Sequence, residues 1–127
     1  MRKLFLLFSH TLTEKQVADA KESLGVEEFV YLPTELQRFW SSIPPHLEVL
    51  DEYLSSLKAY IERNAQSKDL FLVQGDFGAC YAMVNYLKTK KIDAYYATTQ
   101  RKTVERLEEG KVVKTSVFEH VRFRQYQ

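Results

Sequence analysis

Histidine, arginine and hydroxyl side chains recur just after apolar segments of this 127-residue sequence. His10 follows the run from Leu4 to Phe8, and Arg101 follows the run from Ile92 to Ala97. An imidazole can exchange protons near neutral pH, and a guanidinium can match phosphate oxygens with its planar fork. These residue types would serve a site that holds phosphates and moves a proton, provided that the fold brings them together.

The chain is organised around residues 69–82, DLFLVQGDFGACYA. The apolar run from Leu70 to Val73 is typical of a strand buried on both faces of a parallel sheet, and a helix-length apolar stretch follows the glycines. Backbone N–H groups between Gly75 and Gly78 could seat a phosphate at the start of that helix. The segment lacks a P-loop lysine and full GxGxxG spacing. The alternative therefore stays open that the glycines only allow a tight turn and that Asp76 caps the helix.

Three apolar runs are expected to form neighbouring parallel strands: Leu4 to Phe8, Leu70 to Val73 and Ile92 to Ala97. A helix or a helix-length segment separates each run from the next, as crossover connections require. Ligands of open α/β sheets gather at the carboxyl ends of the strands. The polar residues that follow these runs, and that we expect to converge there, are Ser9, His10, Thr11, Gln74, Thr98, Thr99 and Arg101.

Two capping-box pairs predict helix starts, Thr13 with Gln16 and Thr34 with Gln37. The first of these helices should end at Gly25, because glycine readily takes the left-handed conformation that follows a helix.

A longer amphipathic helix is expected from Pro45 to about Asn64, with leucines at helical spacing on one side. Its wide apolar stripe suits a sheet face or a partner subunit, and the sheet face is favoured. A short strand from Phe29 to Leu32 precedes it and ends at Pro33.

The C-terminal part of the chain predicts a β-hairpin. Thr103 to Leu107 and Lys111 to Phe118 flank a turn in which Gly110 takes the left-handed position. Together with the alternating strands and helices before it, this hairpin indicates an α/β fold with a mostly parallel sheet flanked by helices.

The closing segment FEHVRFRQY carries basic side chains at alternate positions. On a strand, this spacing would place the imidazole of His120 and the guanidiniums of Arg122 and Arg124 on one face. The alternative is the solvated face of an edge strand, where basic residues discourage aggregation.

Composition predicts one domain over residues 1–127, because 45% of the residues are hydrophobic and the chain is long enough for a real core. The net charge of +1 argues against a general nucleic-acid coat, and no DNA partner is expected. The single Cys80 cannot build a disulfide or zinc framework, so we expect a cytoplasmic location and no metal or other cofactor. The run from Leu4 to Phe8 is too short for a signal segment or a membrane span.

Four segments, taken together, resemble a CRISPR-associated family: SHTLT at 9–13, VQGDFGA at 73–79, ATTQR at 97–101 and HVRFR at 120–124. Over essentially its whole length the chain is similar to the family numbered twenty in the Csx series, small stand-alone relatives of the CARF sensor domains of type III CRISPR systems.

The resemblance implies a Rossmann-like, CARF-like fold and a homodimer that binds a cyclic oligoadenylate, with the tetra-adenylate ring favoured. It further implies that the protein degrades this messenger as a ring nuclease and so switches off type III CRISPR signalling. Two copies of one pocket, related by a two-fold axis, would grip a ring of repeated nucleotides.

Such a ring carries its own nucleophile, the ribose 2′-OH. The protein must therefore align this hydroxyl with the phosphate and stabilise the developing charge, and it needs a metal less. The candidates for the chemical step are His10, Ser9, Asp76 and His120, and His10 is preferred over His120 as the proton carrier. The candidates for ligand binding are Thr11, Gln74, Gly75, Phe77, Gly78, Thr98, Thr99, Arg101, Arg122 and Arg124.

Two other classes of function stay open. A protein that binds the messenger without cutting it, as a sponge or sensor, needs the same pocket without a working acid and base. A flavodoxin-like nucleotide-binding or scaffold protein would explain the fold equally well and the polar residues at the strand ends less well.

Overall fold

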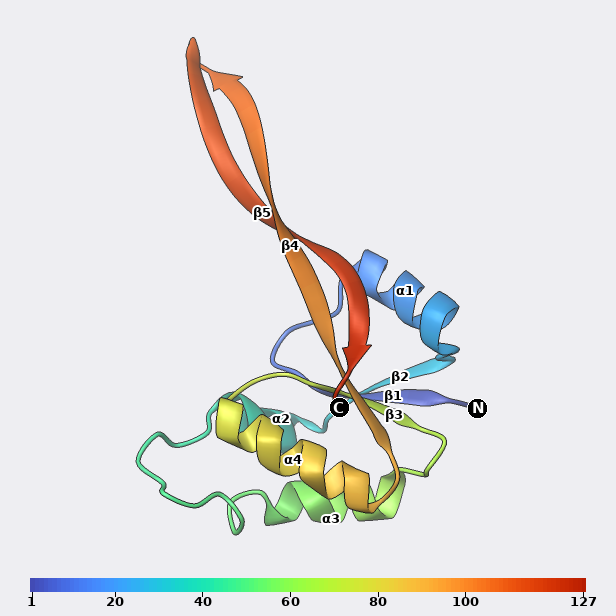
Figure 1. Ribbon diagram of the computed structural model, residues 1–127. Helices are drawn as coiled ribbons and strands as arrows, with labels where there is room; N and C mark the ends of the chain where they lie inside the picture. Colours follow the sequence, from blue (N-terminus) through green and yellow to red (C-terminus); the bar gives the residue numbers. More distant parts are fainter.

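The computed structural model describes residues 1–127 as a five-stranded sheet with helices on both faces (Figure 1). The strand order is β2-β1-β3-β4-β5; the first four strands run parallel, and β5 runs antiparallel to β4. The strands are β1 Lys3–Leu7, β2 Glu28–Tyr31, β3 Leu70–Val73, β4 Asp93–Glu108 and β5 Lys111–Gln125. The helices are α1 Glu14–Leu24, α2 Thr34–Ser41, α3 Ser55–Asn64 and α4 Phe77–Thr89. The predicted α/β class, mostly parallel sheet and C-terminal hairpin are therefore confirmed.

The three apolar runs predicted to be parallel neighbours do lie side by side, because β3 pairs with β1 on one edge and with β4 on the other. At their carboxyl ends, the backbone N–H of Gln74 donates to the carbonyl oxygen of Leu7 at 3.0 Å. The backbone N–H of Ala97 donates to Oε1 of Gln74 at 2.6 Å. The predicted convergence of the strand ends at one edge of the sheet is thus confirmed.

Apolar side chains fill the space on both faces of the sheet. Helix α1 covers one face, and helices α2, α3 and α4 cover the other (Figure 1). On the second face, the rings of Phe5 and Phe71 stack with centroids 4.9 Å apart beneath the buried Trp40 and Ile61. Each large apolar side chain buried in this way stabilises the fold by about 1.5–3 kcal/mol. None of the helices combines the length and the apolar character that crossing a bilayer demands.

The two capping-box predictions have different outcomes. Thr13 and Gln16 form the predicted box at the start of α1, and Gly25 ends that helix in the left-handed conformation. Thr34 does not cap α2, because Pro33 occupies the cap position and no side chain caps that end. Gln37 instead donates a hydrogen bond through its amide nitrogen to the backbone oxygen of Phe8, just after β1, at 2.6 Å, so this prediction is wrong.

The long helix predicted from Pro45 to Asn64 is also too long. Residues 45–54 form turns and irregular backbone, and α3 begins only at Ser55. Leu54 and Leu57 are buried beneath the sheet, whereas Leu47 is exposed. The apolar spacing therefore predicts the helix correctly only in the C-terminal half of this segment. In the N-terminal half, two adjacent prolines and the polar residues after them favour turns.

Strand β4 does not end at Ala97, contrary to the sequence-based prediction. It continues to Glu108, because β5 pairs with it from Tyr95 onward. A two-residue turn joins the strands, with φ of 52° at Glu109 and 75° at Gly110, so the predicted left-handed Gly110 is confirmed. We call residues 99–120 the arm, since this two-stranded hairpin extends away from the sheet and the helices (Figure 1).

A close contact between Gly75 and Trp40 generates a stability prediction. A Cβ atom at Gly75 would lie 3.0 Å from Nε1 of Trp40, and this indole is held by a 2.9 Å hydrogen bond to the backbone oxygen of Gln74. Because the buried indole has little room to move, Gly75→Ala should lower the free energy of unfolding by about 1–3 kcal/mol in urea titrations. Gly78→Ala is the control, since its Cβ would meet only ordinary contacts at 3.5 Å and a helical alanine is favoured. Equal stability of the two variants would contradict the prediction.

Candidate functional site

A groove lies where the carboxyl edge of the sheet meets α4 and the end of β5. Its volume is ≈ 630 Å³, within the usual range for small-molecule sites. We call it the edge groove. Its lining includes Gln74, Phe77, Cys80, Tyr81, Lys88, Tyr96, Arg124 and Tyr126. Four aromatic rings and two cations are thus among the side chains that form its surface.

Arg124 is placed against an aromatic pair in the edge groove. Its Nη1 donates to the hydroxyl oxygen of Tyr96 at 2.9 Å, and its guanidinium carbon lies 5.5 Å from the centroid of the same ring. The rings of Tyr96 and Tyr126 are tilted with centroids 4.9 Å apart. Because the guanidinium uses one nitrogen for Tyr96, its other donors are left to bind a phosphate or carboxylate.

Two aromatic side chains on the first turns of α4 stand almost free of the protein. Phe77 is 94% exposed and Tyr81 is 75% exposed. They are four residues apart and therefore lie on one side of the helix. Large exposed rings at the rim of a groove suit stacking against a planar ligand such as a nucleobase.

The floor of the edge groove contains a thiol and a phenol that stay neutral. Burial raises the pKa of Cys80 to about 11, and burial raises the pKa of Tyr126 to about 12. The hydroxyl of Tyr126 donates to the backbone oxygen of Val73 at 2.6 Å, which fixes the ring against β3. A thiol with such a pKa is not a thiolate nucleophile at neutral pH, so Cys80 serves the groove as a packing residue.

The glycine turn after β3 is arranged around Asp76. Oδ2 of Asp76 accepts a hydrogen bond from the backbone N–H of Ala79 at 3.0 Å, which makes Asp76 the N-cap of α4. Ala79 directly follows Gly78, so this carboxylate lies next to the N–H groups considered above for a phosphate. The capping alternative for Asp76 is therefore confirmed, and its negative charge opposes a phosphate at the glycine turn.

The β1–α1 loop carries the predicted Ser9, His10 and Thr11, and all three are exposed. The hydroxyl oxygen of Ser9 accepts a hydrogen bond from Ser41 of α2 at 3.1 Å. The ring of His10 meets the ring of Phe8 edge-on, with centroids 5.5 Å apart. These residues lie at the carboxyl edge, as predicted, but they do not line the edge groove.

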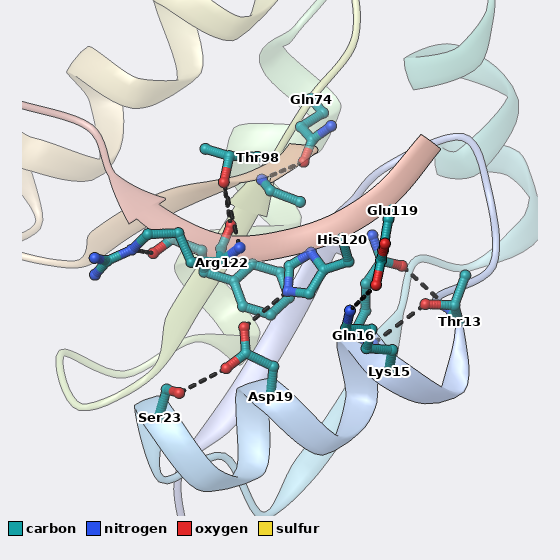
Figure 2. Close-up of polar contacts among 12 residues, drawn as sticks. Thr13, Lys15, Gln16, Asp19, Ser23, Gln74, Thr98, Glu119, His120 and Arg122 are labelled. Atoms are coloured by element: carbon teal, nitrogen blue, oxygen red, sulfur yellow. Dashed lines mark hydrogen bonds and ion pairs between the residues drawn. The ribbon is translucent and has the colours of Figure 1, made fainter. Parts of the chain in front are cut away.

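A β-bulge separates His120 from the two arginines that follow it. Thr98 pairs with Arg122 and the next residue, Thr99, pairs with His120, so Val121 is the extra residue. The bulge turns His120 toward Asp19 of α1 (Figure 2). The ring of His120 lies 4.8 Å from that of Phe123, measured between centroids. The prediction that His120, Arg122 and Arg124 share one face is therefore wrong, because a bulge breaks the period of two.

His120 is held tightly on the α1 side. Its Nε2 lies 2.7 Å from Oδ2 of Asp19, and its side chain is 4% exposed (Figure 2). Burial opposes ionisation of Asp19, but hydrogen bonds from Ser23 and His120, together with the positive charges of His120 and Arg122, outweigh it and lower the pKa of the carboxyl group. His120 thus connects the base of the arm to α1 and does not line the edge groove.

The other predicted residues of β4 and β5 lie at or beyond the base of the arm. The hydroxyl of Thr98 donates to the backbone oxygen of Arg122 at 3.1 Å. Nε of Arg122 donates to the backbone oxygen of Phe123 at 3.3 Å. Arg101 lies farther out on the arm, 5.7 Å above the ring of Phe118.

The edge groove contains four of the predicted site residues, Gln74, Gly75, Phe77 and Arg124. Sequence reasoning missed its tyrosines, Tyr81, Tyr96 and Tyr126, and the cation of Lys88. The four-residue spacing of Phe77 and Tyr81, which lie outside the buried stripe of α4, could have indicated two exposed rings on one side of this helix. Nowhere do three or more His, Cys, Asp or Glu side chains lie close enough together to hold a metal ion.

Comparison with known proteins gives a match to one family. Residues 2–124 match the family described as "Uncharacterized protein MJ1673 family". The protein "Uncharacterized protein MJ1673" of Methanocaldococcus jannaschii is 47% identical over 126 residues, which covers 99% of this chain and 98% of the relative. No solved structure matches the chain.

The neutral thiol in the edge groove generates a prediction about reactivity. With a pKa of about 11, Cys80 should be mostly protonated at pH 8, so alkylation by iodoacetamide should be roughly a hundredfold slower than in guanidinium-unfolded protein. The folded rate should still rise about tenfold per pH unit between pH 9 and 10, where the unfolded rate levels off. A folded rate that levels off near pH 9 would show that burial does not control this thiol.

Proposed function

The chain belongs to the MJ1673 family, and we propose that it binds a cyclic oligoadenylate, with the tetra-adenylate ring favoured, and cleaves it as a ring nuclease. The observation that carries the binding proposal is the edge groove, which combines exposed aromatic rings with a guanidinium at the carboxyl edge of a parallel sheet. Ligands of open α/β sheets bind at this edge. The CARF-like character of the fold and the role in type III CRISPR signalling are parts of the same proposal.

Each part of the groove suits one part of an adenylate. The rings of Phe77 and Tyr81 offer faces on which an adenine can stack, and stacking of this kind is worth about 1–3 kcal/mol per base. The free donors of Arg124 and the ammonium of Lys88 suit the bridging phosphate, since they are the cations that line the groove. The amide of Gln74 is already engaged with Ala97 and holds the edge in place.

The proposed cleavage uses the ring's own ribose. The 2′-oxygen attacks the adjacent phosphorus, the bond to the 5′-oxygen breaks, and the product ends in a 2′,3′-cyclic phosphate. A base must take the proton of the 2′-OH, and an acid must supply one to the leaving 5′-oxygen. His10 is exposed at the carboxyl edge and is free to do either, whereas His120 is buried against Asp19. We therefore assign the proton transfer to His10; because His10 does not line the edge groove, this assignment requires that the ring extend along the carboxyl edge from the groove to the β1–α1 loop.

A protein that only sequesters the messenger would use the same groove. Incubation of labelled cyclic tri-, tetra- and hexa-adenylate with the protein, followed by product analysis, separates cutting from sequestration. A thermal-shift comparison with FMN and NAD tests the flavodoxin-like alternative in parallel.

Arg124 is the residue on which the binding proposal depends most directly. Arg124→Ala should raise the dissociation constant for cyclic tetra-adenylate about tenfold or more, because a charge-assisted contact to phosphate is worth about 1.5–3 kcal/mol. Isothermal titration calorimetry would measure this change. Arg63→Ala, on the last turn of α3, is the matched control and should bind as the unaltered protein does. Equal binding by both variants would refute the groove as the ligand site.

The proposed proton transfer predicts a specific loss of rate. His10→Ala should reduce single-turnover cleavage by about a hundredfold or more while the dissociation constant changes little. His46→Ala removes a histidine from the segment of turns before α3 and should leave the rate unchanged. Cleavage should also proceed in EDTA, since the 2′-OH supplies the nucleophile. Full single-turnover activity of the His10→Ala variant would rule out this histidine as the proton carrier.

A further inference from the structure

We propose that the arm binds a second copy of this chain, with the outer edge of β5 paired antiparallel to the same edge of the partner. β5 is the last strand of the sheet, so its outer backbone groups have no neighbouring strand. The arm has only two strands, and an isolated two-stranded hairpin is marginally stable in water. A partner strand would satisfy the backbone groups and bury the side chains that the arm exposes.

The arm has the features of an edge that recruits another strand. Its exposed apolar side chains include Leu107, Val112 and Phe118, at 77%, 60% and 69% exposure. Pairing with β4 is regular from Lys111 to His120, and the bulge lies only at the base. No proline interrupts this stretch. A long, regular and partly apolar edge strand is one that natural monomers avoid.

The hairpin geometry fixes which residues face the free edge. A two-residue turn closes on the pair Glu108 and Lys111, which we take as a hydrogen-bonded pair. Hydrogen-bonded and non-hydrogen-bonded pairs alternate along an antiparallel ladder. The even-numbered residues of β5 from Val112 to Phe118 therefore turn their backbone groups outward. Even-numbered residues of β5 can pair only with even-numbered residues of the partner's β5. The two-fold axis must therefore lie where one residue faces its own copy in the partner.

A two-fold axis at Thr115 gives complementary partners at both ends of the paired segment. It places Lys111 opposite the partner's Glu119, Val112 opposite the partner's Phe118, and Val113 opposite the partner's Val117. The remaining pairs are Lys114 with the partner's Ser116 and Thr115 with the partner's Thr115. Opposite charges therefore meet at both ends, apolar side chains meet between them, and no like charges face each other.

The neighbouring registers are worse. An axis at Lys114 would place that lysine opposite itself and Glu109 opposite the partner's Glu119. An axis at Ser116 would place Val113 opposite the partner's Glu119 and Lys114 opposite the partner's Phe118. Like charges directly opposite each other are destabilising, and an apolar side chain opposite a charged one is not buried against an apolar partner. Of these three registers, the sequence of β5 favours the one centred on Thr115.

The interface gives the homodimer a structural basis that does not depend on the proposed ligand. It joins two arms into one four-stranded sheet and separates the two protein bodies by roughly 30 Å, at about 3.4 Å per residue from Lys111 to Glu119. Each edge groove is then formed by the residues of one chain. The grip of one ring by two pockets, which the resemblance implies, would need a different interface and stays a separate prediction.

Cysteine cross-linking tests the register directly. In a non-hydrogen-bonded antiparallel pair the Cα atoms are about 4.5 Å apart, close enough for a disulfide. In a Cys80→Ala background, Thr115→Cys should form a covalent dimer under mild oxidation. Val113→Cys is the matched control on the same strand, because its two copies would lie about 14 Å apart and should not cross-link. A Thr115→Cys protein that stays monomeric on a non-reducing gel, or that cross-links no better than the control, overturns the register.

Charge reversal tests the same interface in the uncrosslinked full-length protein. Lys111→Glu and Glu119→Lys should each weaken the dimer about tenfold in light-scattering titrations, and the double variant should restore it. Lys15→Ala removes the 2.8 Å ion pair that Glu119 makes within the chain and should leave the dimer unchanged. A monomer at all concentrations, or a dimer insensitive to these reversals, would refute the proposal. Binding of cyclic tetra-adenylate, measured separately, would survive either failure.

Discussion

Gln74 holds the carboxyl edge of the sheet together, and the candidate site depends on that arrangement. Its backbone N–H binds the end of β1, its backbone oxygen accepts from Trp40 of α2, and its side-chain oxygen accepts from β4 at Ala97. One residue thereby satisfies polar groups that would otherwise be left unpaired where three elements end. The same contacts orient the turn that leads into α4 and so set one wall of the edge groove.

The bulge at Val121 divides β5 into two parts whose side chains contact different regions of the protein. Before it, His120 is turned toward Asp19 of α1 and supports the base of the arm. After it, Arg124 is turned toward Tyr96 and the edge groove. A regular strand would have placed both side chains on one face, and either the support of the arm or the cation of the groove would have been lost.

The sequence predicts the structure well where residues close together in the chain determine it. It predicts the structure less well where contacts between distant segments determine it. The apolar run of β3, the capping box at Thr13 and the left-handed Gly110 could be predicted from neighbouring residues alone. The extent of β4 could not, because its continuation depends on pairing with β5. The bulge likewise depends on register, and Gln37 was lost as a cap because the backbone after β1 competes for its amide. Of the predicted site residues, only Gln74, Gly75 and Phe77 at the glycine turn, together with Arg124, line the groove.

Charge along α4 determines how an adenylate would lie in the edge groove. Asp76 places a carboxylate at the N-terminus of this helix, and Lys88 places an ammonium in its last turn. A phosphate beside Asp76 would meet a like charge in place of the usual attraction of a helix N-terminus. The phosphate is therefore favoured toward Arg124 and Lys88, and the base toward the exposed rings of the first turns. The glycine turn then acts by shape, since Gly75 lets Trp40 approach, and not as an anion site.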